Sequence, residues 1–452
     1  MPEATHTFPA SFLWGTATAG YQMEGQGTNT DFWQWEQTPG HILGGRLSGD
    51  ACDWWNGRRW QEDFDRAAAD GHNALRLSVE WARVQPERDR WDEHALDHYR
   101  QMVQGLRQRG LTPMVTLHHF VNPLWAAAPG HHIWETGEAA ALFEQYTRKV
   151  VAALGDYVDL WCTINEPNAY MVQSWVLGAM PPSKKDIGLA LKVAANLLRA
   201  HAAAYRAIHE LQPQAMVGLP VHFDWIMPAR PGFALDEWAA RTQFNMFSSL
   251  FGDALATGRL RRPLMPSVPV PEARGTQDFV GIQYYTGIVA RFDVSNAGQL
   301  FARRSFPPGA ELDVMAAAGN MAGYASYPTG LFETLSWVQR YKLPIFITEN
   351  GIGDSEDGLR RRYLIRHLRE LWRAVNFNFD VRGYFHWSLL DNFEWDRGWA
   401  HRFGLYALDP DTQVRTARPS AQLYSEIARS HTLSSDMVSR YAPELKEQMF
   451  PG

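Results

Sequence analysis

The segments Trp161-Cys-Thr-Ile-Asn-Glu-Pro167 and Pro344-Ile-Phe-Ile-Thr-Glu-Asn-Gly351 decide the fold class. Each begins as a short uncharged run of mostly apolar and β-branched residues, which is typical of a strand buried on both faces. Runs of the same kind recur along the chain, and a stretch with helical periodicity follows each of them. This alternation is typical of parallel βα units.

Eight strands and eight helices are predicted from this alternation. The predicted strands are 12–20, 73–79, 113–120, 158–165, 215–223, 278–286, 344–350 and 381–388. The predicted helices lie near 60–70, 93–109, 137–154, 186–211, 236–257, 328–341, 360–375 and 419–430. The count favours a closed (β/α)₈ TIM barrel of the α/β class, although periodicity alone also allows an open sheet. We therefore expect a single domain over residues 1–452, with a core from about 8 to 430.

Local signals support some helix ends. Pro419 suits the first turn of the last helix, and Gly71 and Gly110 stand where a left-handed helix cap is expected. The stretch 287–326, between the sixth strand and its helix, is poor in regular pattern. We expect it to lie over the barrel mouth as a lid or substrate-facing loop.

Composition excludes several classes of function. The chain has 43 Lys+Arg against 49 Asp+Glu, a net charge of −6, and no basic block, so nucleic acid and anionic membranes are poor partners. Cys52 and Cys162 form no CxxC pattern, which argues against a disulfide framework and fits a reducing compartment. Neither a signal peptide nor a run of about 20 apolar residues is visible. We expect a cytoplasmic protein, whose oligomeric state the sequence does not indicate.

Two carboxylates stand at strand ends, where the catalytic residues of such barrels lie. Glu166 closes the fourth predicted strand and Glu349 the seventh. Burial raises the pKa of a carboxyl group, whereas positive charge or hydrogen-bond donors lower it. Two carboxyls in different surroundings can act as proton donor and nucleophile, as glycoside hydrolysis requires. The structural alternative is that each Glu caps its strand or pairs with a surface arginine.

Arg76 is expected inside the barrel, where an unpaired charge is very costly. It either forms a structural ion pair with Glu80 or Glu24, or holds the nucleophile ionised. His118 and His119 are adjacent on one strand and point to opposite faces, so they are poor partners for a shared metal ion. We expect no metal and no cofactor, with His119 as a hydrogen-bonding residue beside the site.

Aromatic residues make up 13% of the chain, with 19 Trp, 16 Tyr and 23 Phe. Sugar rings expose C–H faces that pack on aromatic planes, while their hydroxyls need polar partners. The segment Gly383-Tyr-Phe-His-Trp-Ser-Leu-Leu-Asp-Asn-Phe-Glu-Trp395 offers this mixture at the end of the eighth strand. We assign only a few aromatics, chiefly Tyr285, Trp387 and Trp395, to a sugar site and the rest to packing.

At these residues the chain closely resembles glycoside hydrolase family one, the β-glucosidase family. The resemblance runs from Phe8 to about Arg429. Its motifs are Phe12-Leu-Trp-Gly-Thr-Ala-Thr-Ala19, Tyr21-Gln-Met-Glu-Gly25, Thr116-Leu-His-His-Phe120, Thr163-Ile-Asn-Glu-Pro167, Asp278-Phe-Val-Gly-Ile-Gln-Tyr-Tyr-Thr286, Ile347-Thr-Glu-Asn-Gly351 and Asp391-Asn-Phe-Glu-Trp395. Any one of them is weak, but together and in this order they are highly specific.

The resemblance implies a (β/α)₈ barrel that hydrolyses small β-glycosides or oligosaccharides with retention, with Glu166 as acid/base and Glu349 as nucleophile. Arg76 and Tyr285 are implied to contact the nucleophile. The implied substrate-binding residues are Gln22, His119, Asn165 (to the sugar 2-hydroxyl), Tyr285, Trp387 (as stacking platform), Glu394 and Trp395. Phe120, Tyr324 and Phe403 are expected on the aglycone side. Retention predicts that the two carboxyl groups lie about 5–5.5 Å apart.

Three positions depart from the usual family pattern: Gln283 replaces Asn before the Tyr pair, Tyr324 replaces Trp after Gly323, and Phe120 replaces Trp. These changes bear on substrate preference and leave both carboxylates in place. Glu394 would repel a phosphate group, which disfavours 6-phosphosugars. We expect glucosides first, then galactosides and fucosides. The alternatives are a transglycosidase that uses the same residues, and a non-catalytic carbohydrate-binding barrel, which the presence of both Glu residues disfavours.

Overall fold

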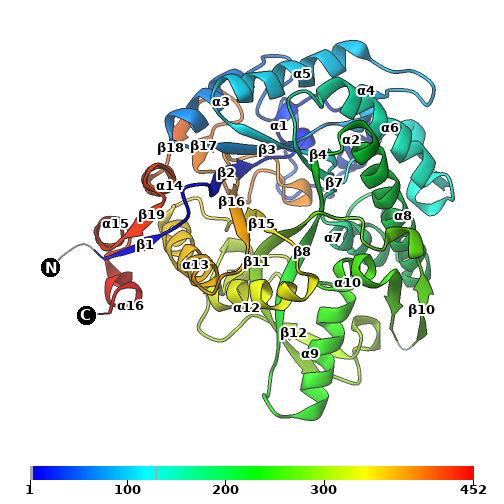
Figure 1. The fold of residues 1–452 in the computed structure, drawn as a ribbon. Helices are drawn as coiled ribbons and strands as arrows, with labels where there is room; N and C mark the ends of the chain where they lie inside the picture. The colour runs from blue at the N-terminus through cyan, green and yellow to red at the C-terminus, as the bar shows by residue number, and fades with distance from the viewer. Residues whose placement is uncertain (1–3, 129, 264, 452) are drawn as a thin grey trace.

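The computed structural model describes residues 4–128, 130–263 and 265–451, and its centre is a closed barrel of eight parallel strands (Figure 1). The barrel strands are β2 (Leu13–Ala17), β3 (Ala74–Ser78), β4 (Thr112–His118), β7 (Leu160–Ile164), β8 (Met216–Pro228), β11 (Phe279–Phe292), β15 (Ile345–Asn350) and β16 (Val381–Trp387). They follow this order around the barrel, and the pairing of β16 with β2 closes it. The predicted fold class is confirmed.

Helices surround the barrel in Figure 1, close to their predicted positions. They are α3 (Trp60–Ala69), α5 (Glu93–Gln108), α6 (Ala139–Leu154), α8 (Ile187–Leu211), α9 (Ala234–Met246), α10 (Leu250–Thr257), α12 (Pro328–Val338), α13 (Gly358–Asn376) and α14 (Pro419–Ser430). Pro419 occupies the first turn of α14, and Gly71 and Gly110 follow their helices with positive φ, as expected.

The single helix predicted at 236–257 is wrong, because the structure divides it into α9 and α10. The break falls at 247–249, where the hydroxyl of buried Ser248 bonds to the backbone of Asp224 in β8. This contact ties the chain to a barrel strand. It competes with continuation of the helix, as short hydroxyl side chains commonly do.

The fifth and sixth strands are longer than predicted. β8 and β11 stay paired as far as Pro228 and Ala290, and β12 (Ala302–Ser305) adds to β11 in antiparallel fashion. The start of 287–326 is therefore sheet and not irregular loop. The segment also holds η5 (Ala297–Gln299), β13 (Glu311–Leu312), α11 (Val314–Ala317) and β14 (Ala325–Ser326).

The barrel strands are buried on both faces, which explains their continuous apolar runs. Every residue of β3 and β7 is buried, including the charged Arg76. A buried guanidinium needs an anionic partner, since several kcal/mol are lost when a charge is desolvated alone. The burial of Arg76 in β3 therefore predicts that a carboxylate lies nearby.

Short elements lie in the connections and at the ends. They are α1 (Gly20–Glu24), α2 (Asp31–Glu36), α4 (Trp81–Val84), β5 (Ala127–Ala128), β6 (His131–His132), α7 (Pro167–Met171), β9 (Arg259–Arg262), β10 (Met265–Pro269), β17 (Tyr406–Leu408), β18 (Arg415–Ala417), α15 (Ser435–Tyr441) and α16 (Lys446–Met449). β1 (Thr5–Thr7) pairs with β19 (Thr432–Ser434), so both chain ends lie on one side of the molecule (Figure 1).

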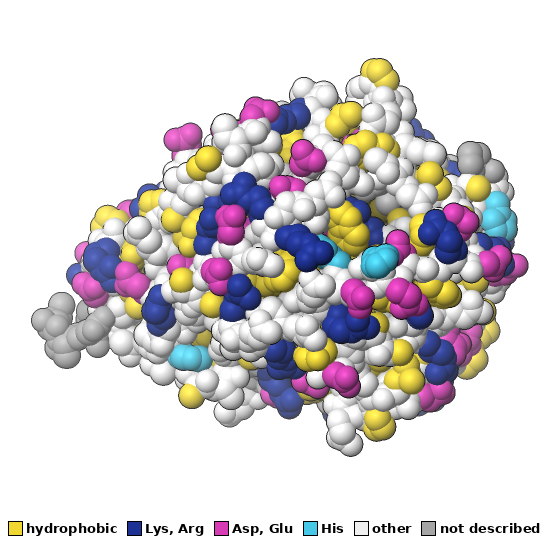
Figure 2. Space-filling model, turned by 90° about the horizontal axis from the view of Figure 1, so that it is seen from above, with side chains coloured by type: hydrophobic (Ala, Val, Ile, Leu, Met, Phe, Trp, Pro, Cys, Tyr) yellow, Lys and Arg dark blue, Asp and Glu magenta, His cyan; other side chains and the backbone are white. Residues whose placement is uncertain are grey.

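Charged side chains of both signs are interspersed over the face that Figure 2 shows. Within the described ranges, no helix has the length and apolar character that a membrane span needs.

Candidate active site

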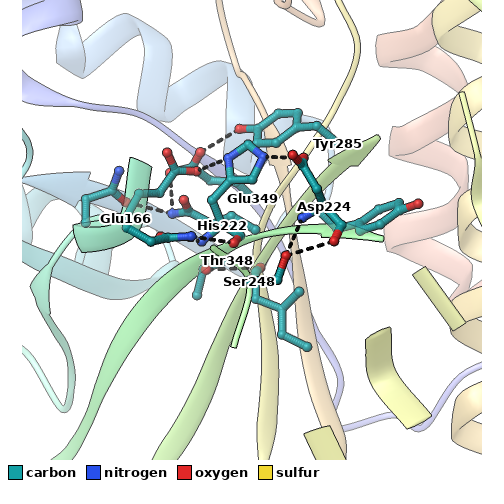
Figure 3. Close-up of polar contacts among 12 residues, drawn as sticks. Glu166, His222, Asp224, Ser248, Tyr285, Thr348 and Glu349 are labelled. Carbon is teal, nitrogen blue, oxygen red and sulfur yellow. Dashed lines mark hydrogen bonds and ion pairs between the residues drawn. The ribbon is translucent and has the colours of Figure 1, made fainter. Parts of the chain in front are cut away.

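Glu166 and Glu349 lie at the carboxyl end of the barrel, at the ends of β7 and β15 (Figure 3). Both are buried, with 7% and 3% of their surface exposed. Glu166 precedes Pro167 and has a left-handed backbone with φ of 38°. Phe120 and Trp395 also have positive φ, at 71° and 50°. Left-handed conformations of residues other than glycine are costly and tend to gather at functional sites.

Three side chains donate hydrogen bonds to Glu349. Arg76 Nη1 and Gln283 Nε2 donate to Oε1, the latter over 2.7 Å, and Tyr285 Oη donates to Oε2 over 2.5 Å. Donors of this kind favour the ionised carboxylate. The amide of Gln283, one methylene longer than the Asn of the family pattern, thus reaches Glu349.

Opposing effects act on the pKa of Glu349. Burial and the charge of Glu166 raise it and Arg76 and Tyr285 lower it, and together these effects place it at about 7. The charge of Glu166 therefore acts on the protonation of Glu349, as a like charge in the same buried site does. One proton shared by two carboxyls provides an acid and an anion at the same pH.

Arg76 pairs with Glu349 and with neither Glu24 nor Glu80. Its Nη2 also donates to Asn165 Oδ1 over 2.5 Å. The alternative of a structural ion pair with Glu24 or Glu80 is wrong, because Arg83 takes Glu24 at 2.6 Å.

Asn165 lies between the nucleophile's partners and His119. Its Oδ1 also accepts from Gln283 at 2.6 Å, and its Nδ2 lies 3.0 Å from His119 Nε2. His118 points away and lies 3.1 Å from Asn122, as strand alternation predicted. Among the described residues no group of three or more His, Cys, Asp or Glu side chains could hold a metal ion.

Gln22 and Glu394 come from opposite ends of the chain and meet in the site. Gln22 Nε2 donates to Glu394 Oε2 over 3.1 Å. Burial raises the pKa of Glu394 to about 7, against the lowering effect of Arg397. Gln22 Oε1 and His119 Nδ1 are buried without a hydrogen-bond partner among the described residues. Unpaired buried polar atoms are costly, and ligand hydroxyls would satisfy them.

Aromatic rings form two groups. The His119 ring lies 6.2 Å from Trp387, 5.9 Å from Trp395 and 5.1 Å from Phe120, centroid to centroid. Phe120, expected on the aglycone side, therefore packs with residues expected to hold the sugar.

In the second group of aromatic rings, the ring of Tyr324 stacks on Tyr285 with centroids 4.8 Å apart. Phe403 lies 6.1 Å from Tyr324 and 6.3 Å from Tyr285. The structure thus brings Tyr324 and Phe403 together, beside a residue that contacts Glu349.

Sequence reasoning missed the partners of Glu166. His222 Nδ1 lies 3.0 Å from Glu166 Oε1, and His222 Nε2 lies 3.1 Å from Asp224 (Figure 3). Arg304 of β12 forms a 2.7 Å ion pair with Asp224. The sequence did contain a signal for these partners. His222 and Asp224 are two positions apart at the end of the fifth predicted strand and therefore share one face of it, but no site residue was expected there.

The two carboxylates thus have different surroundings. Glu349 is held by Arg76, Tyr285 and Gln283, whereas one oxygen of Glu166 faces an imidazole. Such a pair can combine an anionic nucleophile with a proton donor on one bond.

Comparison with known proteins gives one family over nearly the whole chain. The model of glycosyl hydrolase family 1 matches residues 4–433. β-Glucosidase A of Thermotoga maritima is 33% identical, covering 94% of this chain and 98% of the relative. A β-galactosidase of Saccharolobus solfataricus is 30% identical, covering 96% and 97%. The solved structure of a β-glycosidase from Pyrococcus horikoshii superposes with a TM-score of 0.88 at 36% identity, covering 98% of this chain and all of the other.

Proposed function

The chain belongs to glycosyl hydrolase family 1 and is a glycoside hydrolase, and from this premise we propose that it is a retaining β-glucosidase with Glu349 as nucleophile and Glu166 as acid/base. The observation that carries the proposal is the convergence of Arg76, Gln283 and Tyr285 on Glu349, with Glu166 at the same end of the barrel, three strands away. The carboxyl separation of about 5–5.5 Å stays a prediction.

In the first step, an oxygen of Glu349 forms a bond to the anomeric carbon of the substrate. The bond from that carbon to the leaving oxygen breaks, and Glu166 gives its proton to this oxygen. Arg76 and Tyr285 favour the ionised form of Glu349 and orient it for the attack. Asn165, held by Arg76 and Gln283, is available to the sugar 2-hydroxyl.

In the second step, Glu166 takes a proton from water as the water oxygen bonds to the anomeric carbon. The ester bond to Glu349 breaks, and the sugar leaves with its original configuration. Transfer to a second sugar would use the same side chains, and no contact of the described residues favours it.

We place the sugar ring between Gln22 and Glu394 on one side and Trp387 and Trp395 on the other. The polar pair supplies acceptors and donors for hydroxyls, and the indoles supply apolar faces. Tyr324, at the end of the segment 287–326, and Phe403 are then next to the leaving group. The relatives named as β-glucosidase and β-galactosidase support glucosides and galactosides as substrates.

The cellular compartment belongs to the same proposal. Cys52 and Cys162 are both free and buried, which supports a reducing compartment such as the cytoplasm. A panel of nitrophenyl β-glycosides with cellobiose determines the preferred sugar, and we expect the highest kcat/KM on the glucoside.

The roles of the carboxylates are tested by Glu349→Gly and, as the matched variant, Glu166→Gly. We expect Glu349→Gly to lose hydrolysis, because nothing then attacks the anomeric carbon. Azide should restore turnover of an activated β-glucoside and give the α-glycosyl azide, since it enters from the face that Glu349 occupied. With Glu166→Gly, azide should attack the glycosyl-enzyme and give the β-glycosyl azide.

The anomer of each azide is read by proton NMR. Near-normal hydrolysis by Glu349→Gly without azide would show that Glu349 is not the nucleophile. Exchange of the two products between the variants would reverse the assignment.

A further inference from the structure

A row of charged groups runs from buried Glu166 to half-buried Arg304. It consists of Glu166, His222, Asp224 and Arg304, and we call it the histidine row. Its three contacts measure 3.0, 3.1 and 2.7 Å. His222 and Asp224 are on the same face of β8, and Figure 3 shows His222 between the two carboxylates.

The surroundings of His222 favour its cationic form. Burial opposes the charge, but Glu166 and Asp224 raise the pKa of His222 to about 10. The other titratable rings that face it are Tyr285, stacked at 5.5 Å, and Tyr324 at 6.5 Å. Both are phenols whose pKa burial raises, so they are neutral at ordinary pH. The two carboxylates thus face one imidazolium and, through Asp224, one guanidinium.

We propose that His222 is a positioning residue for the proton donor, which fixes Oε1 of Glu166 and supports the carboxylate that forms when Glu166 gives up its proton. This inference rests on the proposed role of Glu166. The contact with His222 occupies Oε1, so Oε2 is the oxygen that faces the leaving group. Asp224 and Arg304 hold the imidazolium, with Asp224 bonded to Nε2.

The row has a specific consequence for catalysis. When Glu166 protonates the leaving oxygen, a negative charge develops beside His222, and a cation at 3.0 Å stabilises it. This support matters for a leaving group that needs a proton, such as a sugar alkoxide. It matters little for dinitrophenolate, which leaves as a stable anion.

His222→Asn tests the proposal, because the amide keeps a hydrogen-bond donor near Oε1 and removes the charge. We expect the alkaline limb of the kcat/KM profile to move up by roughly one to two pH units, since an opposite charge this close changes proton affinity by that amount. We also expect kcat/KM on cellobiose to fall about 10- to 100-fold, with dinitrophenyl β-glucoside changed less than about threefold.

His201→Asn is the matched control. His201 is also fully buried and hydrogen-bonded, to Thr163 and the Thr276 carbonyl, but it lies on α8 and does not contact Glu166. We expect the alkaline limb of the kcat/KM profile of His201→Asn to stay where it is in the unmodified enzyme. Asp224→Asn provides a second variant, in which the imidazolium of His222 remains while the negative charge of Asp224 is lost. Loss of a nearby like charge lowers the pKa of a carboxyl group, so the limb should move downward, opposite to His222→Asn and by a smaller amount.

The outcomes separate this inference from the proposed function. An unmoved limb in both His222→Asn and Asp224→Asn would overturn the inference while hydrolysis by the unmodified enzyme stands. Equal losses on cellobiose and the dinitrophenyl substrate, without a pH shift, would show a purely structural role. If the unmodified enzyme hydrolysed neither substrate, the proposed function would fail first. If His222→Asn folds poorly, the pH profile of Asp224→Asn decides between these outcomes. A reduced amount of folded enzyme lowers kcat/KM by the same factor at each pH and leaves the position of the limb unchanged.

Discussion

Tyr285 contacts the proposed nucleophile Glu349 through a single atom, its hydroxyl oxygen. Its hydroxyl donates to Oε2, while Arg76 and Gln283 share Oε1. Both oxygens of the proposed nucleophile are therefore fixed, and the three donors favour the ionised carboxylate against the effect of burial. Removing one donor should weaken the ionised form without changing the shape of the barrel.

Tyr285→Phe should move the acid limb of the kcat/KM profile to higher pH. Glu349 attacks only when ionised, and loss of the hydroxyl raises its pKa, so activity is lost earlier as the pH falls. A hydrogen bond to a charged group is worth about 1.5–3 kcal/mol, which corresponds to a shift of roughly one to two pH units.

Tyr284→Phe is the control for that variant, because the Tyr284 hydroxyl donates to the Tyr327 carbonyl and not to a carboxylate. Its acid limb should stay in place. An acid limb that moved to lower pH in Tyr285→Phe would contradict the role of the hydroxyl.

For single residues, the sequence predicted which side chains belong to the site better than it predicted which side chains they contact. Glu166 and Glu349 follow apolar strands, so their position at the barrel mouth could be predicted from the strand pattern. The choice of Arg76 between Glu349, Glu24 and Glu80 could not, since it depends on side chains far apart in the chain. The histidine row was missed for the same reason, because Arg304 reaches Asp224 from a stretch with no regular pattern.

Secondary structure was predictable where local sequence decides it. Pro419 and Gly71 marked a helix start and a helix end correctly, because first-turn and left-handed positions select these residues. The break between α9 and α10 depends on Ser248 bonding to β8. The extension of β11 depends on pairing with β8 and β12. Such tertiary contacts override local periodicity.

The segment after β16 carries Glu394 and Trp395, and a buried ion pair holds its start. Asp391 accepts two hydrogen bonds of 2.8 Å from Arg418, and its Oδ1 also accepts from Gly404 N at 2.9 Å. Removing one member of a buried pair leaves the other charge without compensation, which costs about 3–5 kcal/mol.

Asp391→Asn should therefore lower the Tm by about 3–5 °C, since unfolding entropy scales with chain length and 1 kcal/mol corresponds to roughly 1 °C at this size. Calorimetry measures the change. Asp411→Asn is the control, because Asp411 pairs with Arg46 at the surface, where such pairs contribute about 0–1 kcal/mol. Equal shifts in both variants would contradict a structural role for the buried pair.

At the scale of the molecule, the aromatic residues mostly build the barrel. Trp14, Trp81, Trp134 and Trp161 are fully buried side chains outside the proposed sugar site. The rings that we assign to the substrate are few, as the sequence led us to expect. The interspersed charges in Figure 2 fit the modest net charge of −6.

The central claim is that two displacements at one anomeric carbon leave its configuration unchanged. Proton NMR of the sugar first released from nitrophenyl β-glucoside, recorded before mutarotation, tests it most directly. We predict that the β-anomer appears first and that the α-anomer grows in later. Initial release of the α-anomer would mean a single displacement by water and would contradict the nucleophilic role of Glu349.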